Sequence, residues 1–159
     1  MEEPSSTRFD TRAEFETHFR DCLLAAEHTL ALFDPDCAVF PLGSSDTDTL
    51  LRAFLARGGA LRLALHSPAH VERHYPRLLR LLRDYSHAVE CRVTPRALHN
   101  LTDSFCIVDG RHVLRRFHSD HMRGEMALDA PASVDVPLHR FEAIWLEARP
   151  ALQPTKTGL

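Results

Sequence analysis

The sequence has no long apolar run and no clustered cysteines. No stretch approaches the roughly 18 apolar residues that a membrane-spanning helix needs, and residues 1–6 are acidic and polar, unlike a signal peptide. Cys22, Cys37, Cys91 and Cys106 are scattered without a Cys-x-x-Cys pair. This spacing argues against a disulfide framework and against a zinc ribbon. The sequence therefore predicts a cytoplasmic chain with reduced cysteines.

Signatures of the common catalytic and cofactor-binding classes are also missing. The loop Pro41-Leu42-Gly43-Ser44-Ser45 has too few glycines for a phosphate loop, and neither Gly-x-Ser-x-Gly nor Gly-x-Gly-x-x-Gly occurs. We therefore expect no cofactor. The formal net charge of −3 and the pI near 6.4 argue against a dedicated nucleic-acid binder, so nucleic acid is not an expected partner.

The length and composition are those of one globular domain. The chain has 159 residues, of which 44% are hydrophobic and 26% are charged, enough to bury an ordinary core. Residues 1–10 and 150–159 lack apolar periodicity and are rich in Pro, Ser, Thr and Gly. We therefore expect one domain over residues 11–149, with a flexible N-terminus and a flexible C-terminal tail.

Apolar spacing predicts alternating helices and strands. A capping box at Thr11 and Glu14 opens the first helix, further helices begin near Asp46 and Ser67, Pro76 interrupts the third, and the last begins near Ser133. The expected strands are Leu30–Phe33, Leu61–Leu65, Val89–Val93, Phe105–Val108, Val113–Phe117 and Glu125–Leu128. This order predicts an α/β fold with a mixed sheet of about six strands and helices on both faces.

The segment from Thr102 to Gly110 carries the most specific pattern. An apolar strand ends in Asp109-Gly110, which is a strong turn signal, so the next strand should fold back as a hairpin. Asp109 is a natural turn residue, and Asp103 could cap the strand entry by bonding its own backbone. Further on, the chain has a strand with Glu125 and a helix ending in Phe141 and Trp145.

This order resembles one half-domain of the phospholipase D superfamily. There the strand carries histidine, any residue, lysine, four residues and aspartate, followed by a Gly-Ser-x-Asn turn. Anchoring the pattern on Asp109 puts Thr102 at the histidine and Ser104 at the lysine position. Arg116, Phe117 and Ser119 fall at the Gly, Ser and Asn positions. The chain is also similar to uncharacterised bacterial stand-alone domains of this degenerate type.

The resemblance implies that the usual chemistry has been lost. In active members the histidine attacks phosphorus and the lysine stabilises phosphoryl charge, and two motifs meet at a twofold or pseudo-twofold axis. Threonine and serine supply neither function. A chain with one motif would also have to form a homodimer to complete such a site.

Neighbouring residues could replace the missing groups. His99 and His118 are the candidate nucleophiles, and Arg115, Arg116 and Arg123 are candidate anion-binding groups. Residues 111–123 hold four arginines and one acid, a local charge of 4 − 1 = +3. Strand alternation places Arg116 and His118 on one face and Arg115 on the other.

Several groups keep alternative interpretations. An arginine-rich hairpin is often a solvated strand edge that discourages aggregation. Glu125 could pair with Arg116 or Arg123. His118, Asp120 and His121 invite a metal interpretation, but no matching ligand pair occurs elsewhere in the sequence, so we expect no metal.

The sequence thus predicts a non-catalytic phospholipase D-like domain. It would bind a phosphate-bearing small molecule or nucleotide, or a protein partner, through an arginine-lined groove at Ser104, Arg116, His118, Arg123 and Glu125. The alternatives are an active homodimeric phosphodiesterase or nuclease that uses His99 or His118, and a purely protein-binding module.

Overall fold

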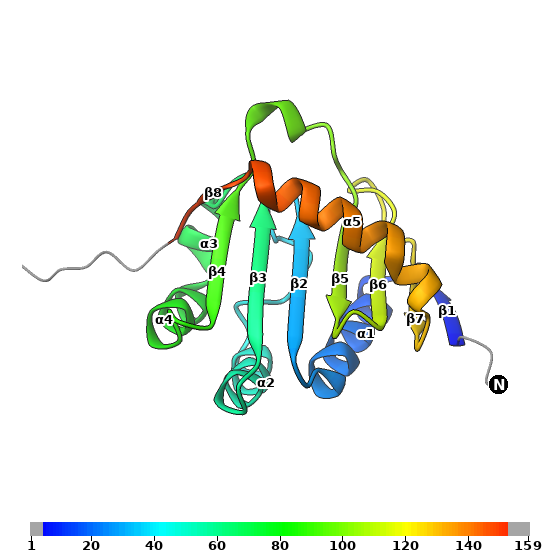
Figure 1. Ribbon diagram of the computed structural model, residues 1–159, viewed down its shortest axis with the longest axis horizontal. Coiled ribbons are helices and arrows are strands. Elements are labelled where there is room, and N and C mark those ends of the chain that lie inside the picture. Colours follow the sequence, from blue (N-terminus) through cyan, green and yellow to red (C-terminus); the bar gives the residue numbers. More distant parts are fainter. Residues whose placement is uncertain (1–4, 153–159) are drawn as a thin grey trace, which may run out of the picture.

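Eight strands form one mixed sheet with the order β1-β7-β6-β5-β2-β3-β4-β8 (Figure 1). The computed structural model describes residues 5–152. The strands are β1 (Ser5–Phe9), β2 (Thr29–Asp34), β3 (Ala60–Leu65), β4 (Val89–Val93), β5 (Ser104–Val108), β6 (His112–Arg116), β7 (Gly124–Leu128) and β8 (Arg149–Pro150). Strands β2, β3 and β4 are parallel to one another, and every other pairing is antiparallel.

Helices cover both faces of the sheet. The helices are α1 (Arg12–Ala25), α2 (Ser45–Ala56), α3 (Ala69–His74), α4 (Pro76–Asp84) and α5 (Pro131–Glu147), with a short 3-10 helix, η1 (Arg96–Leu98). Figure 1 shows α5 alone across one face, while α1 to α4 lie on the other. No helix in residues 5–152 has both the length and the apolar composition to cross a bilayer.

Strand alternation divides the core into two layers. Leu30 and Leu32 of β2 pack with α1, α2 and α4 in the larger layer. Ala31 and Phe33 point the other way and pack with Phe141 and other residues of α5. Because successive side chains of a strand point to opposite faces, each inner strand contributes to both layers. This explains why β2 and β5 consist almost entirely of buried residues.

The predicted fold class is confirmed, with two strands more than expected. All six predicted strands are present, and Thr11 caps α1 by accepting a hydrogen bond from the Glu14 amide at 3.2 Å. The Glu14 side chain reciprocates slightly differently from a standard capping box, accepting from the Thr11 hydroxyl and from the Asp10 amide. The predicted cap at Thr11 is therefore present, whereas α3, α4 and α5 begin without a side-chain cap.

The two additional strands lie at the edges of the sheet. The expectation of a flexible N-terminus is wrong for Ser5–Phe9, which pairs with all of β7 and buries Phe9 against Phe15. Strand β8 pairs with Arg92 and Val93, and its second residue, Pro150, is the first residue of the expected tail. Short edge strands carry little alternation, so sequence periodicity does not reveal them. Residues 1–4 and 153–159, expected to be flexible, lie outside the described residues.

Candidate functional site

Three polar residues meet where β2 ends, β5 begins and β6 ends. Asp34 is the last residue of β2, and Ser104 and Arg116 are opposite each other in the β5–β6 register. The neighbouring pair Phe33 and Phe105 aligns β2 with β5. Alternation therefore puts all three side chains on the face that α1 to α4 cover. We call Asp34, Ser104 and Arg116 the Asp34 cluster.

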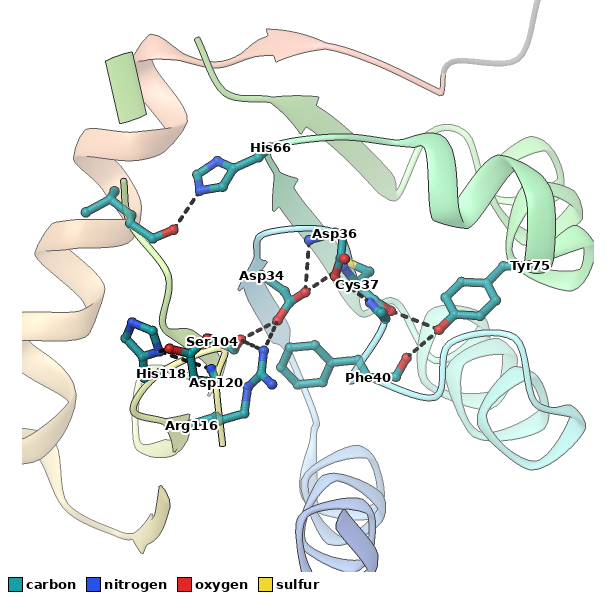
Figure 2. A network of polar contacts seen from close by, with 12 residues as sticks. Asp34, Asp36, Cys37, Phe40, His66, Tyr75, Ser104, Arg116, His118 and Asp120 are labelled. Carbon is teal, nitrogen blue, oxygen red and sulfur yellow. Dashed lines mark hydrogen bonds and ion pairs between the residues drawn. The ribbon is translucent and has the colours of Figure 1, made fainter. Parts of the chain in front are cut away.

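The Asp34 cluster is closed to solvent. Ser104 donates its hydroxyl hydrogen to Asp34 Oδ1, and Arg116 Nη2 donates to the same oxygen at 3.4 Å and to Ser104 Oγ at 3.2 Å (Figure 2). Asp34 and Ser104 have no exposed surface, and Arg116 is 8% exposed. At the position of the catalytic lysine in the phospholipase D motif, this chain therefore has a serine that is hydrogen-bonded to both members of the buried Asp34–Arg116 ion pair.

The second oxygen of Asp34 fixes the loop that follows β2. Asp34 Oδ2 accepts hydrogen bonds from the backbone amides of Asp36 at 3.0 Å and Cys37 at 2.5 Å. The Tyr75 hydroxyl lies 2.9 Å from the Cys37 carbonyl oxygen and 3.2 Å from that of Phe40, which holds the loop from the side of α3 and α4 (Figure 2). Both Cys37 and Phe40 are fully buried. One carboxylate thus joins three strands and a packed loop.

The electrostatics of the cluster leave little charge for a ligand. Burial raises the pKa of Asp34 to about 6, although hydrogen bonds from Ser104 and the Asp36 amide and the charge of Arg116 act to lower it. Near neutral pH the carboxylate is therefore ionised and neutralises Arg116. The Nε atom of Arg116 is buried and has no hydrogen-bond partner among residues 5–152. A ligand anion would have to displace Asp34 to reach this guanidinium.

A buried histidine next to the cluster is also fully engaged. His66 follows β3, and its Nδ1 lies 2.6 Å from Thr94 Oγ1 while its Nε2 lies 2.7 Å from the Leu101 carbonyl oxygen. Because a carbonyl can only accept, Nε2 carries the proton and Nδ1 accepts from the threonine hydroxyl. Burial lowers the pKa of His66, which favours this neutral form. The imidazole holds both ends of the loop between β4 and β5.

The two candidate nucleophiles do not enter the Asp34 cluster. His99 is exposed at the end of η1, and its ring lies 4.7 Å from the His66 ring. The side chain of His118 is 44% exposed, and its Nδ1 accepts from the Asp120 amide at 3.0 Å. Figure 2 shows His118 beside Asp120, while Arg116 points toward Asp34. Thr102, at the histidine position, lies in the segment before β5 and is half-buried.

The predicted arginine patch is divided among separate places. Arg111 pairs with Asp129 at the far end of the hairpin, and Arg116 belongs to the Asp34 cluster. The Arg115 guanidinium lies 5.5 Å from the centre of the Phe117 ring. Arg123 is exposed just before β7. The local charge of +3 therefore does not form one groove, because alternation and burial separate its members.

Glu125 also lies apart from its predicted partners. In the sheet register it is opposite Arg115 on β6 and Arg8 on β1, whereas Arg116 is opposite Gly124. A shift of one residue moves a side chain to the other face of a sheet. Within residues 5–152, no carboxylate–guanidinium contact of 4 Å or less involves Glu125. The expected pairing with Arg116 or Arg123 is wrong.

Asp109 and Asp103 both have structural contacts that the sequence did not reveal. The Asp109 carboxylate accepts from the amides of Glu27, His28 and Thr29 at 2.7–3.0 Å, and so holds the start of β2. Asp103, expected to bond its own backbone, instead makes two hydrogen bonds to Arg140 at 2.6 and 2.9 Å. That pair attaches α5 to the entry of β5. Both aspartates therefore maintain the fold around the motif.

The histidine-rich segment after β6 shows no metal-binding geometry in the part of the chain described. The His118 and His121 rings are 6.0 Å apart, but no group of three or more His, Cys, Asp or Glu side chains is arranged to hold an ion. Instead, His121 Nδ1 accepts from the Arg123 amide at 3.2 Å. The segment is thus a turn stabilised by its own imidazoles.

A groove lies at the β1 edge of the sheet, close to this turn. It has a volume of about 520 Å³ and is lined by Arg8, Phe9, Asp10, Glu14, Phe117, His121, Arg123 and Gly124. No carboxylate of residues 5–152 lies within 4 Å of the guanidinium of Arg8 or Arg123. A Cβ atom at Gly124 would lie 1.9 Å from the Arg115 carbonyl oxygen, so only glycine fits this wall. We call this hollow the β1 groove.

Of the residues in the Asp34 cluster and the β1 groove, sequence reasoning named Ser104, Arg116, His121 and Arg123 but not Asp34 or Arg8. Asp34 stands in an Asp-Pro-Asp sequence that was interpreted only as the end of a strand. Arg8 lies in the segment that was expected to be flexible. A polar residue directly after a buried parallel strand was the available signal for Asp34, because such positions converge at one edge of the sheet.

Comparison with known proteins identifies the fold. The model of a family described as Domain of unknown function (DUF7931) matches residues 11–153. None of the curated proteins matches the chain. Among solved structures, Nuc from Salmonella typhimurium, a phospholipase D family member, is 13% identical over 94% of this chain and 99% of its own length, with a TM-score of 0.67.

Two further solved structures are similar. NucT from Helicobacter pylori is 10% identical over 94% of this chain and 100% of its own, with a TM-score of 0.59. TrmBL2, an archaeal chromatin protein whose structure shows a mode of DNA binding, is 12% identical. The aligned region covers 92% of this chain and 54% of the TrmBL2 chain, with a TM-score of 0.70. The fold is phospholipase D-like, and identities this low show the fold alone.

Proposed function

This chain belongs to the family described as Domain of unknown function (DUF7931), and we propose that it is a non-catalytic phospholipase D-like domain that binds a phosphate-bearing ligand in the β1 groove. The proposal keeps Arg123 from the predicted site and moves the ligand away from Arg116. It has two parts, the absence of catalysis and the location of the ligand.

The Asp34 cluster carries the first part. Nucleophilic attack on phosphorus requires an accessible nucleophile and fixed cations near the phosphoryl oxygens. Here Thr102 and Ser104 stand at the histidine and lysine positions of the phospholipase D motif. Ser104 is fully buried, and Asp34 neutralises the guanidinium of Arg116 next to it. His99 and His118 make their own contacts outside the cluster. No reacting group is therefore available at the usual position.

The unpaired arginines support the second part. A guanidinium presents several N–H donors in a planar fork that fits phosphate oxygens. Arg8 and Arg123 both line the β1 groove, and Phe117, 38% exposed, offers an aromatic surface to an apolar or base moiety. Of the two carboxylates lining it, Glu14 is occupied by the Thr11 hydroxyl and the Asp10 amide. The groove thus combines two available cations with a stacking surface.

Thermal unfolding with and without ligand tests the proposal. Inorganic phosphate or AMP at about 100 times the dissociation constant is expected to raise the Tm of the protein by roughly 5 °C or more, since a ligand that binds only the folded state stabilises it. Arg123→Gln should remove most of this shift.

Arg73→Gln is the matched control, because Arg73 is an exposed arginine on α3, far from the β1 groove in the sheet order. It should keep the full shift. An equal shift in the parent protein and in Arg123→Gln would contradict the location of the site, and the lack of any shift in the parent would contradict phosphate binding itself.

A further inference from the structure

A second groove lies at the opposite edge of the sheet, beside β4. It has a volume of about 650 Å³ and runs between the starts of β3 and β4 and the end of α4. Its lining includes the apolar residues Leu61, Leu82, Val89 and Leu152, together with Arg62, Arg83, His87 and the acidic Glu90, whose carboxylate is paired with Arg92. We call it the β4 groove. Its apolar lining and basic rim distinguish it from the β1 groove.

The backbone of β4 is only partly paired on its outer side. Strand β8 is opposite Arg92 and Val93, and the Ala151 amide donates to the Cys91 carbonyl oxygen at 2.9 Å. Among residues 5–152, no strand lies outside Val89 and Glu90. The Val89 amide already donates to the Tyr85 carbonyl oxygen at 3.0 Å, so an extended peptide could form backbone hydrogen bonds only with the groups that remain at this edge. The unpaired part of β4 is also the part that lines the groove.

A row of arginines leads along α4 to the same groove. Arg77, Arg80 and Arg83 are each three residues apart, so they are neighbours on one exposed face, while Leu78, Leu81 and Leu82 are buried. Arg80 has no carboxylate within 4 Å in the described part of the chain, and Arg83 has only a 3.9 Å contact to Asp84. Residues 69–87 hold four arginines and two acids, 4 − 2 = +2, in a chain of net charge −3.

We propose that the β4 groove docks an acidic, extended segment of a protein partner, which lies along the part of β4 that no other strand of residues 5–152 covers on its outer side. Acidic side chains of that segment would contact Arg80 and Arg83, and apolar side chains at alternate positions would enter the groove over Leu82 and Val89. The inference concerns a different edge of the sheet from the β1 groove and does not depend on phosphate binding there.

Chemical complementarity favours this occupant over two others. A nucleic-acid backbone would match the arginines but would leave the apolar lining and the strand edge unused. The chain's own residues 153–159, Gln-Pro-Thr-Lys-Thr-Gly-Leu, contain a lysine and no acidic residue, so they do not match a basic rim. A peptide that alternates acidic and apolar residues uses all three features of the groove.

Binding of defined peptides to the full chain tests the proposal. The probe is a fluorescein-labelled decapeptide with leucine at alternate positions and glutamate between them, and a peptide with lysine in place of glutamate serves as its counterpart. We expect the acidic peptide to bind and the basic peptide not to bind. The double variant Arg80→Gln/Arg83→Gln should weaken binding at least about fivefold, the scale expected for two exposed ion pairs.

The double variant Arg8→Gln/Arg123→Gln removes the same charge from the other edge and should bind the acidic peptide like the parent protein. Bound peptide should also slow hydrogen exchange of β4 backbone amides. The proposal is overturned if the acidic peptide does not bind, if both double variants weaken it equally, or if a single-stranded DNA probe binds instead and loses its affinity in Arg80→Gln/Arg83→Gln.

Discussion

Replacing Asp34 with alanine is expected to lower the free energy of unfolding by about 3–5 kcal/mol, the usual cost of leaving one partner of a buried ion pair without the other. The substitution leaves the Arg116 guanidinium buried without a counter-charge and removes the acceptor for the Asp36 and Cys37 amides. Urea-induced unfolding followed by circular dichroism measures the change.

Two further variants separate the causes. Asp36→Ala is the matched control, because within residues 5–152 the exposed Asp36 carboxylate accepts only from the Ala38 amide in the same loop, and it should cost less than about 1 kcal/mol. Asp34→Ala/Arg116→Met removes the uncompensated charge and should regain about half of the lost stability. If Asp34→Ala were no more destabilising than Asp36→Ala, Asp34 would not hold the cluster together.

Replacing Asp109 with alanine is expected to cost about 3 kcal/mol. Its carboxylate accepts three backbone hydrogen bonds, and bonds to charged groups contribute roughly 1.5–3 kcal/mol each when buried and less when partly exposed. Asp109 also has a φ of 55°, where alanine is strained. Asp129→Ala is the matched control, because Asp129 has a φ of 49° but, in the part of the chain that the structure describes, its carboxylate is bonded only to the exposed Arg111. It should cost less than half as much.

The effect of Asp109 should depend on pH in a defined direction. Burial acts to raise the pKa of Asp109, but the hydrogen bonds from the Thr29, His28 and Glu27 amides lower it below its usual value. A lowered pKa contributes stability that is present above the unfolded value, about 4, and is lost as the pH falls through the folded value. The difference between the parent protein and Asp109→Ala should therefore shrink in acid. A difference that grows in acid would contradict the assigned hydrogen bonds.

The contacts of Asp109 give a structural reason for the part of the motif frame that the chain has. Its three backbone contacts join the turn after β5 to the start of β2, so the aspartate is needed to assemble the sheet whatever happens at the neighbouring positions. Ser104 also contacts β2, because its hydroxyl donates to Asp34, but this contact lies at the opposite end of the strand. The frame around Asp109 is therefore maintained by structural contacts, whichever residues stand at positions 102 and 104.

Local sequence signals predicted most of the fold and less of the site. The strand Val89–Val93 was predicted with its observed bounds because it is a short segment bounded by turn residues. The strand Ser5–Phe9 was missed because its stability comes from pairing with β7, 115 or more residues away, and not from its own pattern. Nothing local marks an edge strand whose partner is distant in sequence.

The site residues depend even more on long-range contacts. Alternation along β6 correctly separated Arg116 from Arg115, but it could not show that Arg116 would be neutralised by Asp34, 82 residues earlier in the chain. The same limit applies to Glu125, whose neighbours depend on the register of three strands. Alternation in the sequence therefore predicted which face of the sheet each side chain lies on. Contacts between strands determine which of the charged side chains are free to bind a ligand.

The most direct test of the central claim is a hydrolysis assay on the purified parent protein. Bis-p-nitrophenyl phosphate and single-stranded DNA are incubated for several days at high protein concentration, beside the variants His99→Ala and His118→Ala. The closed Asp34 cluster predicts no turnover above the buffer rate for either substrate, with all three proteins alike. Turnover by the parent that disappears in His99→Ala or His118→Ala would show an active centre and would contradict the account.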